Sequence, residues 1–342
     1  MSEPAYAFGG PPARGVIKQT PEDFIVEEIP SFEASGSGEH VFLHIEKQGE
    51  NTDHVAKTIA RYAGLPRQAV SYAGLKDRHG RTIQWFSVHI PGKHELDWQG
   101  LNGPSLKVLA VTRNDRKLRK GALKGNRFEI CIREVQGERA ALEQQLQAIK
   151  RDGVPNYFGP QRFGHGGRNV DKARALFTGE LTLRDRHLQG IYLSAARAHL
   201  FNCVLARRVS DSTWNQAITG DVFMFADSHS FFRDELTEDV LRRVAALDIQ
   251  PSGPLWGKGE LATSEDAMEL EMTILEEEKQ LCDGLMAAGM DMARRPLRLP
   301  VADLSWDFPS ADVLRLRFVL PAGAYATTVL REAITVQGQL DE

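Results

Sequence analysis

Short runs of β-branched and aromatic residues recur along the first part of the chain. They predict strands at residues 24–26, 41–45, 106–111 and 128–132. After the second run, apolar residues recur at helical spacing from Thr52 until Gly64 and Pro66 end the pattern. Two further strand-like segments lie on either side of residues 74–80, so a strand pair joined by a turn is expected there.

Helical spacing returns in the second part of the chain. Leu142, Leu146 and Ile149 share one face of a predicted helix that ends before Pro155. A second helix is predicted over residues 194–209, with Ser194 as its N-cap.

A third helix is predicted over residues 264–281, with Ser264 as its N-cap and with Met268, Met272 and Leu275 facing inward. The tail returns to a strand at 313–320 and a helix from about Thr327. The mixture of strands and helices predicts an α+β fold with a mixed, largely antiparallel sheet. At 342 residues, two domains are expected, and the helix-richer middle reads as an insertion.

Composition describes an ordinary globular protein, with 42% hydrophobic and 26% charged residues. Three widely spaced cysteines, without a CxxC motif, argue against a disulfide framework or a zinc cluster. No leader and no bilayer-length apolar stretch is evident, which predicts a cytoplasmic protein without a membrane partner.

The net charge of −4 hides a strong local asymmetry. Residues 113–127 carry seven Lys and Arg against Asp115 alone, whereas 257–280 is strongly acidic. A basic run is often only a solvated face. However, the glycines of this run predict a loop that can approach phosphates closely, and the run ends near an amide and an aromatic ring. Residues 160–208 also mix cations with Phe and Tyr. Phosphate neutralisation beside stacking platforms is typical of nucleic-acid binding, and RNA is the favoured partner.

Several other motifs are weak. Residues 164–167 are rich in glycine but lack the Lys-Ser/Thr of a phosphate-binding loop, so a turn is favoured. His40 and His44 share one face of a predicted strand without a third ligand nearby, which makes a metal site improbable. We therefore expect neither a metal nor a cofactor.

Asp77 lies between Lys76 and Arg78 at a glycine-framed turn. One interpretation is a turn aspartate that supports its own backbone. The other is an ionised carboxylate that acts as a nucleophile or a base without a metal. Because neighbouring side chains along an extended backbone point away from each other, its ion-pair partner is expected from elsewhere in the chain.

Seven stretches, in order along the chain, resemble the TruD family of tRNA pseudouridine synthases. They are KQTPEDFIVEEI (18–29), GEHVFLHIEKQGENT (38–52), VSYAGLKDRHGRTIQW (70–85), LRKGALKGNRF (118–128), GVPNYFGPQRFG (153–164), YLSAARAHLFN (192–202) and LPAGAYATTVLRE (320–332). The resemblance implies an isomerase that converts uridine 13 of tRNA to pseudouridine without a cofactor. It also implies a catalytic domain formed by 1–153 plus 299–342, with an inserted TRUD domain at 154–298.

The resemblance assigns roles to individual residues. Asp77 would be the catalytic carboxylate, as nucleophile at C1′ or as base at C2′. The substrate-binding residues would be Phe24, Asn126, Phe128 and Tyr325, the last a position where the family often has Phe. Lys18 is a candidate catalytic support near the carboxylate. Candidate phosphate contacts are Arg116, Lys117, Arg119, Lys120, Lys124, Arg162 and Arg168.

Two other functions compete with this one. A uridine-methylating enzyme would need a methyl-donor loop or a positioned cysteine, and neither is evident in the sequence. A non-catalytic RNA-binding or assembly factor would account for the basic segments but would leave Asp77 without a task. A monomer is expected, because no long apolar surface pattern stands out.

Overall fold

The computed structural model describes residues 4–92, 95–225 and 230–337, and the chain divides into two compact units. Unit 1 comprises Met1–Pro12, Arg139–Val301 and Ala324–Ala333, and unit 2 comprises Ala13–Glu138, Ala302–Gly323 and Ile334–Glu342. Within the described ranges, none of the helices has the length and the apolar sequence that crossing a bilayer requires.

Unit 2 contains a ten-stranded sheet with the central order β14-β15-β7-β2-β5-β3-β6, to which β1, β4 and β16 add. Among the described strands of this sheet, β1 pairs in parallel with β16 and β2 with β5, and the other neighbours are antiparallel, which confirms the predicted class. The strands are β1 (Ala13–Ile17), β2 (Phe24–Pro30), β3 (His40–Gln48), β4 (Val70–Tyr72), β5 (Arg81–His89), β6 (Leu106–Asn114), β7 (Leu123–Gly137), β14 (Ala302–Ser310), β15 (Val313–Pro321) and β16 (Thr335–Gln337).

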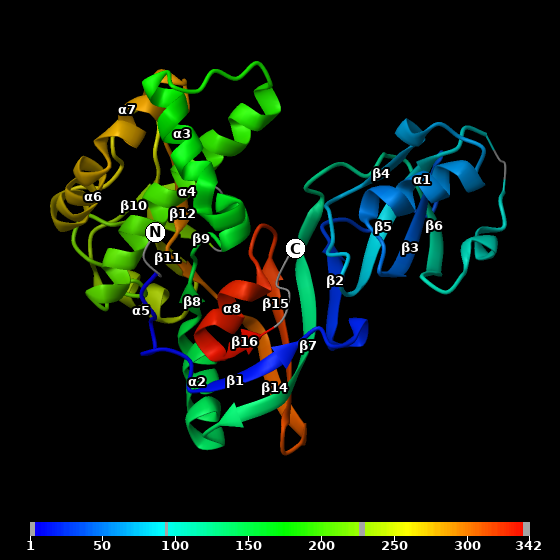
Figure 1. The fold of residues 1–342 in the computed structure, drawn as a ribbon, viewed down its shortest axis with the longest axis horizontal. Helices are drawn as coiled ribbons and strands as arrows, with labels where there is room; N and C mark the ends of the chain where they lie inside the picture. The colour runs from blue at the N-terminus through cyan, green and yellow to red at the C-terminus, as the bar shows by residue number, and fades with distance from the viewer. Residues whose placement is uncertain (1–3, 93–94, 226–229, 338–342) are drawn as a thin grey trace. The chain divides into compact units, whose positions relative to one another are not determined.

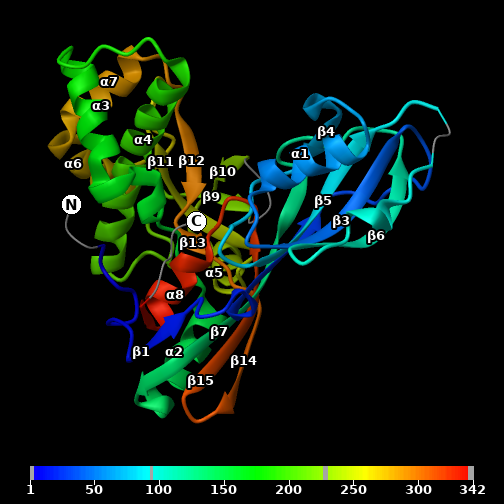
Figure 2. The same cartoon turned by 45° about the vertical axis from the view of Figure 1, so that its right-hand side comes forward.

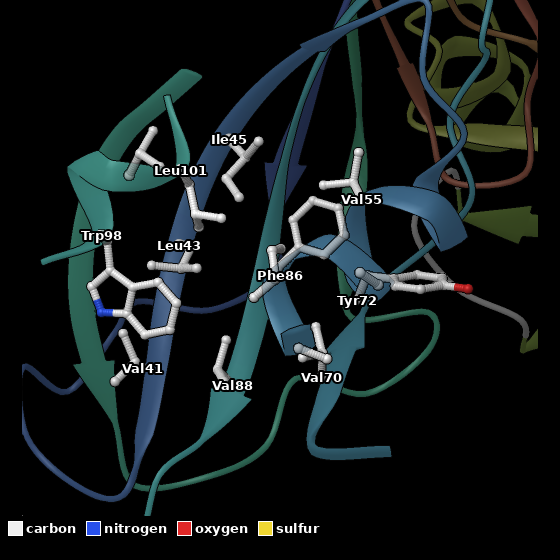
Figure 3. Packing of buried hydrophobic residues seen from close by; sticks show 14 of the residues in the cluster. Val41, Leu43, Ile45, Val55, Val70, Tyr72, Phe86, Val88, Trp98 and Leu101 are labelled. Atoms are coloured by element: carbon white, nitrogen blue, oxygen red, sulfur yellow. The ribbon is translucent and has the colours of Figure 1, made fainter. Parts of the chain in front are cut away.

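One face of the β3–β5–β6 region is covered by helix α1 (Thr52–Tyr62), and these strands lie side by side in both views (Figure 1 and Figure 2). Val41, Leu43 and Ile45 of β3 alternate toward this core, where Figure 3 shows them beside Phe86 and Val88 of β5 and Val55 of α1. Alternation with period two is what a sheet buried on this face requires. The predicted strands and helix are therefore confirmed.

The long strand β7 connects the parts of the sheet (Figure 1). Its residues 123–130 pair with β2, residues 125–132 with β15, and residues 132–137 with β1. The basic run therefore does not form the continuous loop that its glycines predicted. Strand β6 ends at Asn114 and β7 begins at Leu123, so Lys124 and Asn126 belong to a strand. Only residues 115–122 connect the two strands.

Unit 1 is helix-rich and packs around α4 (Arg186–Ser210). Ala195, Ala196, Ala198 and Leu200 of this helix are buried in one apolar cluster with residues of α3, α6 and α7. The other elements are α2 (Arg139–Asp152), α3 (Arg168–Thr178), α5 (Glu238–Ala245), α6 (Glu265–Glu277), α7 (Lys279–Ala287), α8 (Ala326–Ala333), β8 (Val154–Pro155), β9 (Val222–Phe225), β10 (Phe231–Arg233), β11 (Ile249–Leu255), β12 (Ala293–Pro296) and β13 (Arg298–Leu299).

The prediction of Ser194 as a helix N-cap is wrong. Helix α4 begins eight residues earlier, where Asp185 accepts hydrogen bonds from the N–H groups of His187 (2.8 Å) and Leu188 (3.2 Å). Gly190 does not end the helix, because an interior glycine costs only about 1 kcal/mol. Ser194 is interior to the helix, and its Oγ accepts a hydrogen bond from Arg162 Nη1 at 3.0 Å.

The predicted single helix over 264–281 is two helices, because Glu278 leaves the helical conformation between α6 and α7. Ser264 is its N-cap position as expected, although its side chain makes no capping hydrogen bond. The predicted inward face is also wrong for the methionines: Met268 and Met272 are 43% and 37% exposed. Glu271 occupies the buried stripe instead, because its carboxylate pairs with Arg294 at 2.6 Å.

Candidate active site

Asp77 lies in unit 2, in the segment that connects β4 to β5. Its Oδ1 accepts a hydrogen bond from the main-chain N–H of His79 at 2.8 Å, the contact expected of a turn aspartate. Its Oδ2 forms an ion pair with Lys18 Nζ, and the two side chains are only 5% and 4% exposed. The carboxylate is thus fixed at both oxygens and largely withdrawn from water.

Lys18 reaches Asp77 from the end of β1, where its φ of 57° lies in the left-handed region. A non-glycine residue in this region is uncommon, and such strain often marks functional sites. The Lys18 ammonium also lies 4.3 Å from the centre of the Phe24 ring, a cation–π contact. The predicted approach of Lys18 to the carboxylate is present in the structure.

Lys76, next to Asp77 in sequence, pairs with a different carboxylate. Its Nζ lies 3.0 Å from Glu28 Oε2, and these side chains are 6% and 0% exposed. Arg78 donates to the main-chain oxygen of Gly49 at 3.2 Å. The sequence neighbours therefore do not neutralise Asp77, which confirms that its partner comes from elsewhere.

Asn126 and Phe128 lie on one face of β7, opposite Glu28 and Val26 of β2. Among the described residues, Asn126 Oδ1 is buried and finds no hydrogen-bond partner, an arrangement that is costly in a folded protein unless a ligand completes it. Phe128 is 5% exposed and stacks on Phe318, with ring centres 5.3 Å apart. It also meets Phe24 edge-on at 6.4 Å.

The connection 115–122 presents most of the predicted phosphate contacts to solvent. Leu118 anchors this segment in a small apolar cluster with Phe42 and Ala73. Its main chain is also tied to the Asp77 segment, since the N–H of Gly121 donates to the oxygen of Ala73 at 2.8 Å. The predicted phosphate contacts that are exposed here and on β7 are Arg116, Lys117, Arg119, Lys120 and Lys124.

The remaining predicted residues belong to unit 1. Arg162 is half-buried over Phe158 and donates to Ser194, whereas Arg168 is exposed at the start of α3. Tyr325 immediately precedes α8 and interacts electrostatically with Arg295. Burial lowers the pKa of Arg295 to about 10, and the guanidinium stacks on Phe158 at 4.2 Å.

One group of side chains in the described ranges has metal-ligand spacing, namely His199, Cys203 and Glu278, whose ligand atoms lie within 4.8 Å of one another. Glu278 Oε2, however, is 2.6 Å from Arg174, and Glu278 Oε1 is 3.0 Å from His199 Nε2. A carboxylate already paired with a guanidinium and an imidazole is accounted for without an ion. His40 and His44 instead stack on the rings of His89 and Trp85.

Comparison with known proteins identifies the family. The sequence model described as tRNA pseudouridine synthase D (TruD) matches residues 2–181 and 170–333. The chain belongs to the TruD family. The tRNA pseudouridine synthase D of Methylococcus capsulatus is 52% identical over 334 residues, which cover 97% of this chain and 94% of that protein. The enzyme of the same name from Nitrosococcus oceani is 49% identical, with 97% and 94% covered.

A solved structure shares the TruD fold. The crystal structure of the Methanosarcina mazei protein assigned as tRNA pseudouridine synthase D superposes with a TM-score of 0.74. It covers 96% of this chain and 95% of that one at 22% identity, so the likeness concerns the fold. The resemblance stated from the seven sequence stretches is thereby confirmed.

Three residues at this site were not singled out from the sequence: Glu28, Lys47 and Thr52. Lys47 is 1% exposed and donates to the main-chain oxygen of Asp77 at 3.0 Å. Thr52 Oγ1 accepts from the N–H of Lys76 at 3.0 Å. A signal existed for two of them, because Lys47 and Glu28 are charged residues on strands, at positions in step with buried apolar ones.

Proposed function

We propose that this protein isomerises uridine 13 of tRNA to pseudouridine. The observation that carries the proposal is the Asp77 carboxylate, held at both oxygens by Lys18 and by the N–H of His79, in a chain of the TruD family. Such a fixed carboxylate needs no further ordering when the substrate arrives. No metal or cofactor takes part in the proposed reaction.

The reaction breaks the N1–C1′ bond of the uridine, turns the uracil and joins C5 to C1′. C5 loses a proton and N1 gains one, so the product has the mass of the substrate. Asp77 either attacks C1′, forming an ester that the returning base displaces, or removes the C2′ proton to give a glycal, which is protonated again at C2′ when the base rejoins. In both routes the Lys18 ammonium faces the carboxylate and holds its orientation.

The target base must leave its stack to reach Asp77, at a cost of about a few kcal/mol. We assign Asn126 Oδ1, buried without a partner in the described part of the chain, to accept a hydrogen bond from the uracil edge. Phe24 and Phe128 form the aromatic wall, and Tyr325 is the fourth proposed substrate-binding residue. An aromatic stack contributes about 1–3 kcal/mol per base.

The cations of the 115–122 connection, together with Lys124, Arg162 and Arg168, are the proposed phosphate contacts. They are exposed or half-buried, as contact with a polyanion requires. We further propose a cytoplasmic monomer with a catalytic domain at 1–153 plus 299–342 and an inserted domain at 154–298. In its support, Asp77, Lys18, Asn126 and Phe128 lie in unit 2, whereas residues 139–153 and Tyr325 lie in unit 1.

The test is incubation with a tRNA that carries uridine 13, followed by chemical mapping of pseudouridine and by mass measurement. We expect product without a mass change. Asp77→Asn should abolish product and leave the melting temperature and tRNA binding nearly unchanged. Asp303→Asn is the matched control, because Asp303 is exposed and Asn tolerates its φ of 54°.

The outcomes separate the competing functions. An added methyl mass would indicate methylation, and binding without product from the wild-type protein would indicate a non-catalytic RNA-binding factor. Appreciable product from Asp77→Asn would contradict the role of this carboxylate.

A further inference from the structure

The segment that carries Asp77 forms no helix or strand over residues 73–80. Its main-chain N–H and C=O groups therefore need partners outside regular secondary structure, because buried backbone polar groups are almost always hydrogen-bonded. Besides the N–H of Gly121, which donates to the oxygen of Ala73, the partners include buried side chains from β3, α1 and β5.

Three of these contacts lie at and before Asp77. Lys47 Nζ donates to the oxygen of Asp77 itself at 3.0 Å. Thr52 Oγ1 accepts from the N–H of Lys76 at 3.0 Å, and Gln84 Nε2 donates to the oxygen of Gly74 at 3.1 Å. Thr52 also donates to Gln84 Oε1 at 3.0 Å, so these two side chains form one connected unit.

We infer that Lys47 and Thr52 are positioning residues for the proposed reaction, which hold the main chain on either side of the Asp77 Cα so that the carboxylate meets the sugar correctly. Lys47 holds the main-chain oxygen of Asp77, and Thr52 holds the N–H of the preceding residue, Lys76. The inference rests on the function proposed above.

A second feature of Lys47 favours this role. Its side chain is 1% exposed at the end of a strand whose inward positions are otherwise apolar, and its Nζ is also bound to the oxygen of Glu50 at 2.7 Å. Burial lowers the pKa of Lys47 to about 8, against the opposing effect of Asp77, with Lys76 and Glu50 as the other charged groups that act on it. Burying an ammonium destabilises the folded state. Holding the carbonyl of the proposed catalytic residue would account for a buried lysine at this position.

Lys47→Met keeps the length of the side chain and removes both hydrogen bonds. We expect the single-turnover rate of pseudouridine formation to fall about 10²-fold, because a displacement of about 1 Å at a reacting group can have this effect. The KM for tRNA should stay within about threefold of wild type, since no phosphate contact is lost. Lys57→Met is the matched control, because Lys57 is an exposed residue of α1. The rate of this variant should equal that of wild type.

Thr52→Val is the second variant and removes only a hydroxyl. Its rate should fall about tenfold, and the double variant should lose less than the product of the two single effects, because both act on one segment. Amide hydrogen exchange in residues 73–80 should speed up in each variant, and this readout does not need activity.

The outcomes are separable from those of the proposed function. If wild type and Lys57→Met form no pseudouridine, the proposed function fails, and hydrogen exchange alone decides whether Lys47 and Thr52 order the segment. If they form product and folded Lys47→Met has a wild-type rate, the inference is wrong. If Lys47→Met does not fold, a wild-type rate for Thr52→Val contradicts it.

Discussion

Lys18 and Asp77, which are 59 residues apart in sequence, form an ion pair that solvent barely reaches. A pair between exposed groups would contribute little, but here the ammonium and the carboxylate are 4% and 5% exposed. Lys18 therefore fixes the direction of the carboxylate, as the role that we propose for Asp77 requires.

Replacing Lys18 by Met should lower the rate of pseudouridine formation by roughly 10²–10³-fold, the range seen when one preorganised polar contact of an active site is removed. Affinity for tRNA, measured by filter binding, should change little. Lys57→Met again provides the control, and a wild-type rate in Lys18→Met would show that the ion pair is dispensable.

The main effect of breaking the ion pair between Lys76 and Glu28 should be a lower free energy of unfolding. Lys76→Met leaves the carboxylate of Glu28 buried without its cation, which typically costs about 3–5 kcal/mol in the free energy of unfolding. Urea denaturation measures this. The double variant Lys76→Met with Glu28→Gln should recover a large part of the loss, since no unpaired charge is left.

The control for that comparison is an exposed pair. Lys279 lies 3.3 Å from Asp283 on α7, and both side chains are more than half exposed. Lys279→Met should change the free energy of unfolding by less than about 1 kcal/mol. An equal loss in the two variants would contradict the difference that burial makes.

Charge reversal in the connection 115–122 should weaken binding to tRNA. The variant Lys117→Glu with Lys120→Glu should reduce the slope of log K against log salt by about two, since each lost phosphate contact removes about one. Reversal of the exposed Lys57 and Lys107 is the charge-matched control. Equal slopes in the two double variants would place the RNA-binding surface elsewhere.

Lys47 makes stability depend on pH. Because folding lowers its pKa from 10.5 to about 8, the unfolded chain binds the proton more tightly. The free energy of unfolding contributed by this group therefore rises between about pH 8 and 10.5, and below pH 8 the full cost of burying the ammonium is present.

The size of that cost follows from the shift, at about 3 kcal/mol. Urea unfolding of wild type and Lys47→Met at pH 7 and pH 10 isolates it: wild type should gain stability relative to the variant at the higher pH. A difference that is independent of pH would mean that Lys47 is not buried as an ammonium.

The strands of unit 2 and the turn at Asp77 could be predicted because their signals are local. Val41, Leu43 and Ile45 alternate toward the core, and the glycines at 74 and 80 frame the turn. The same alternation places Lys47 inward, two positions beyond Ile45. One of its two acceptors, the oxygen of Asp77, is 30 residues away, so only the folded chain could show this contact.

The prediction failed where a distant partner decided which residue is buried. Apolarity alone favours Met268 and Met272 for the inner face of α6, yet Glu271 is inside because Arg294 of β12 meets it there. Likewise Ser194, which had been assigned to a helix cap, instead accepts a hydrogen bond from Arg162, 32 residues away in the sequence. Local sequence does not contain such pairings.

The register of strand β7 limits where insertions and deletions can occur in this sequence. Asn126 and Phe128 face the site only in one register, and a slip by one residue would present Arg127 in their place. Gly125 enforces that register, because a Cβ at this position would lie 2.2 Å from the oxygen of Leu320. Insertions and deletions within residues 123–130 would therefore disturb the pairing with β2. A change that keeps this register leaves the proposed base-binding residues in place, and the preceding connection is itself held by Leu118 and by the N–H of Gly121.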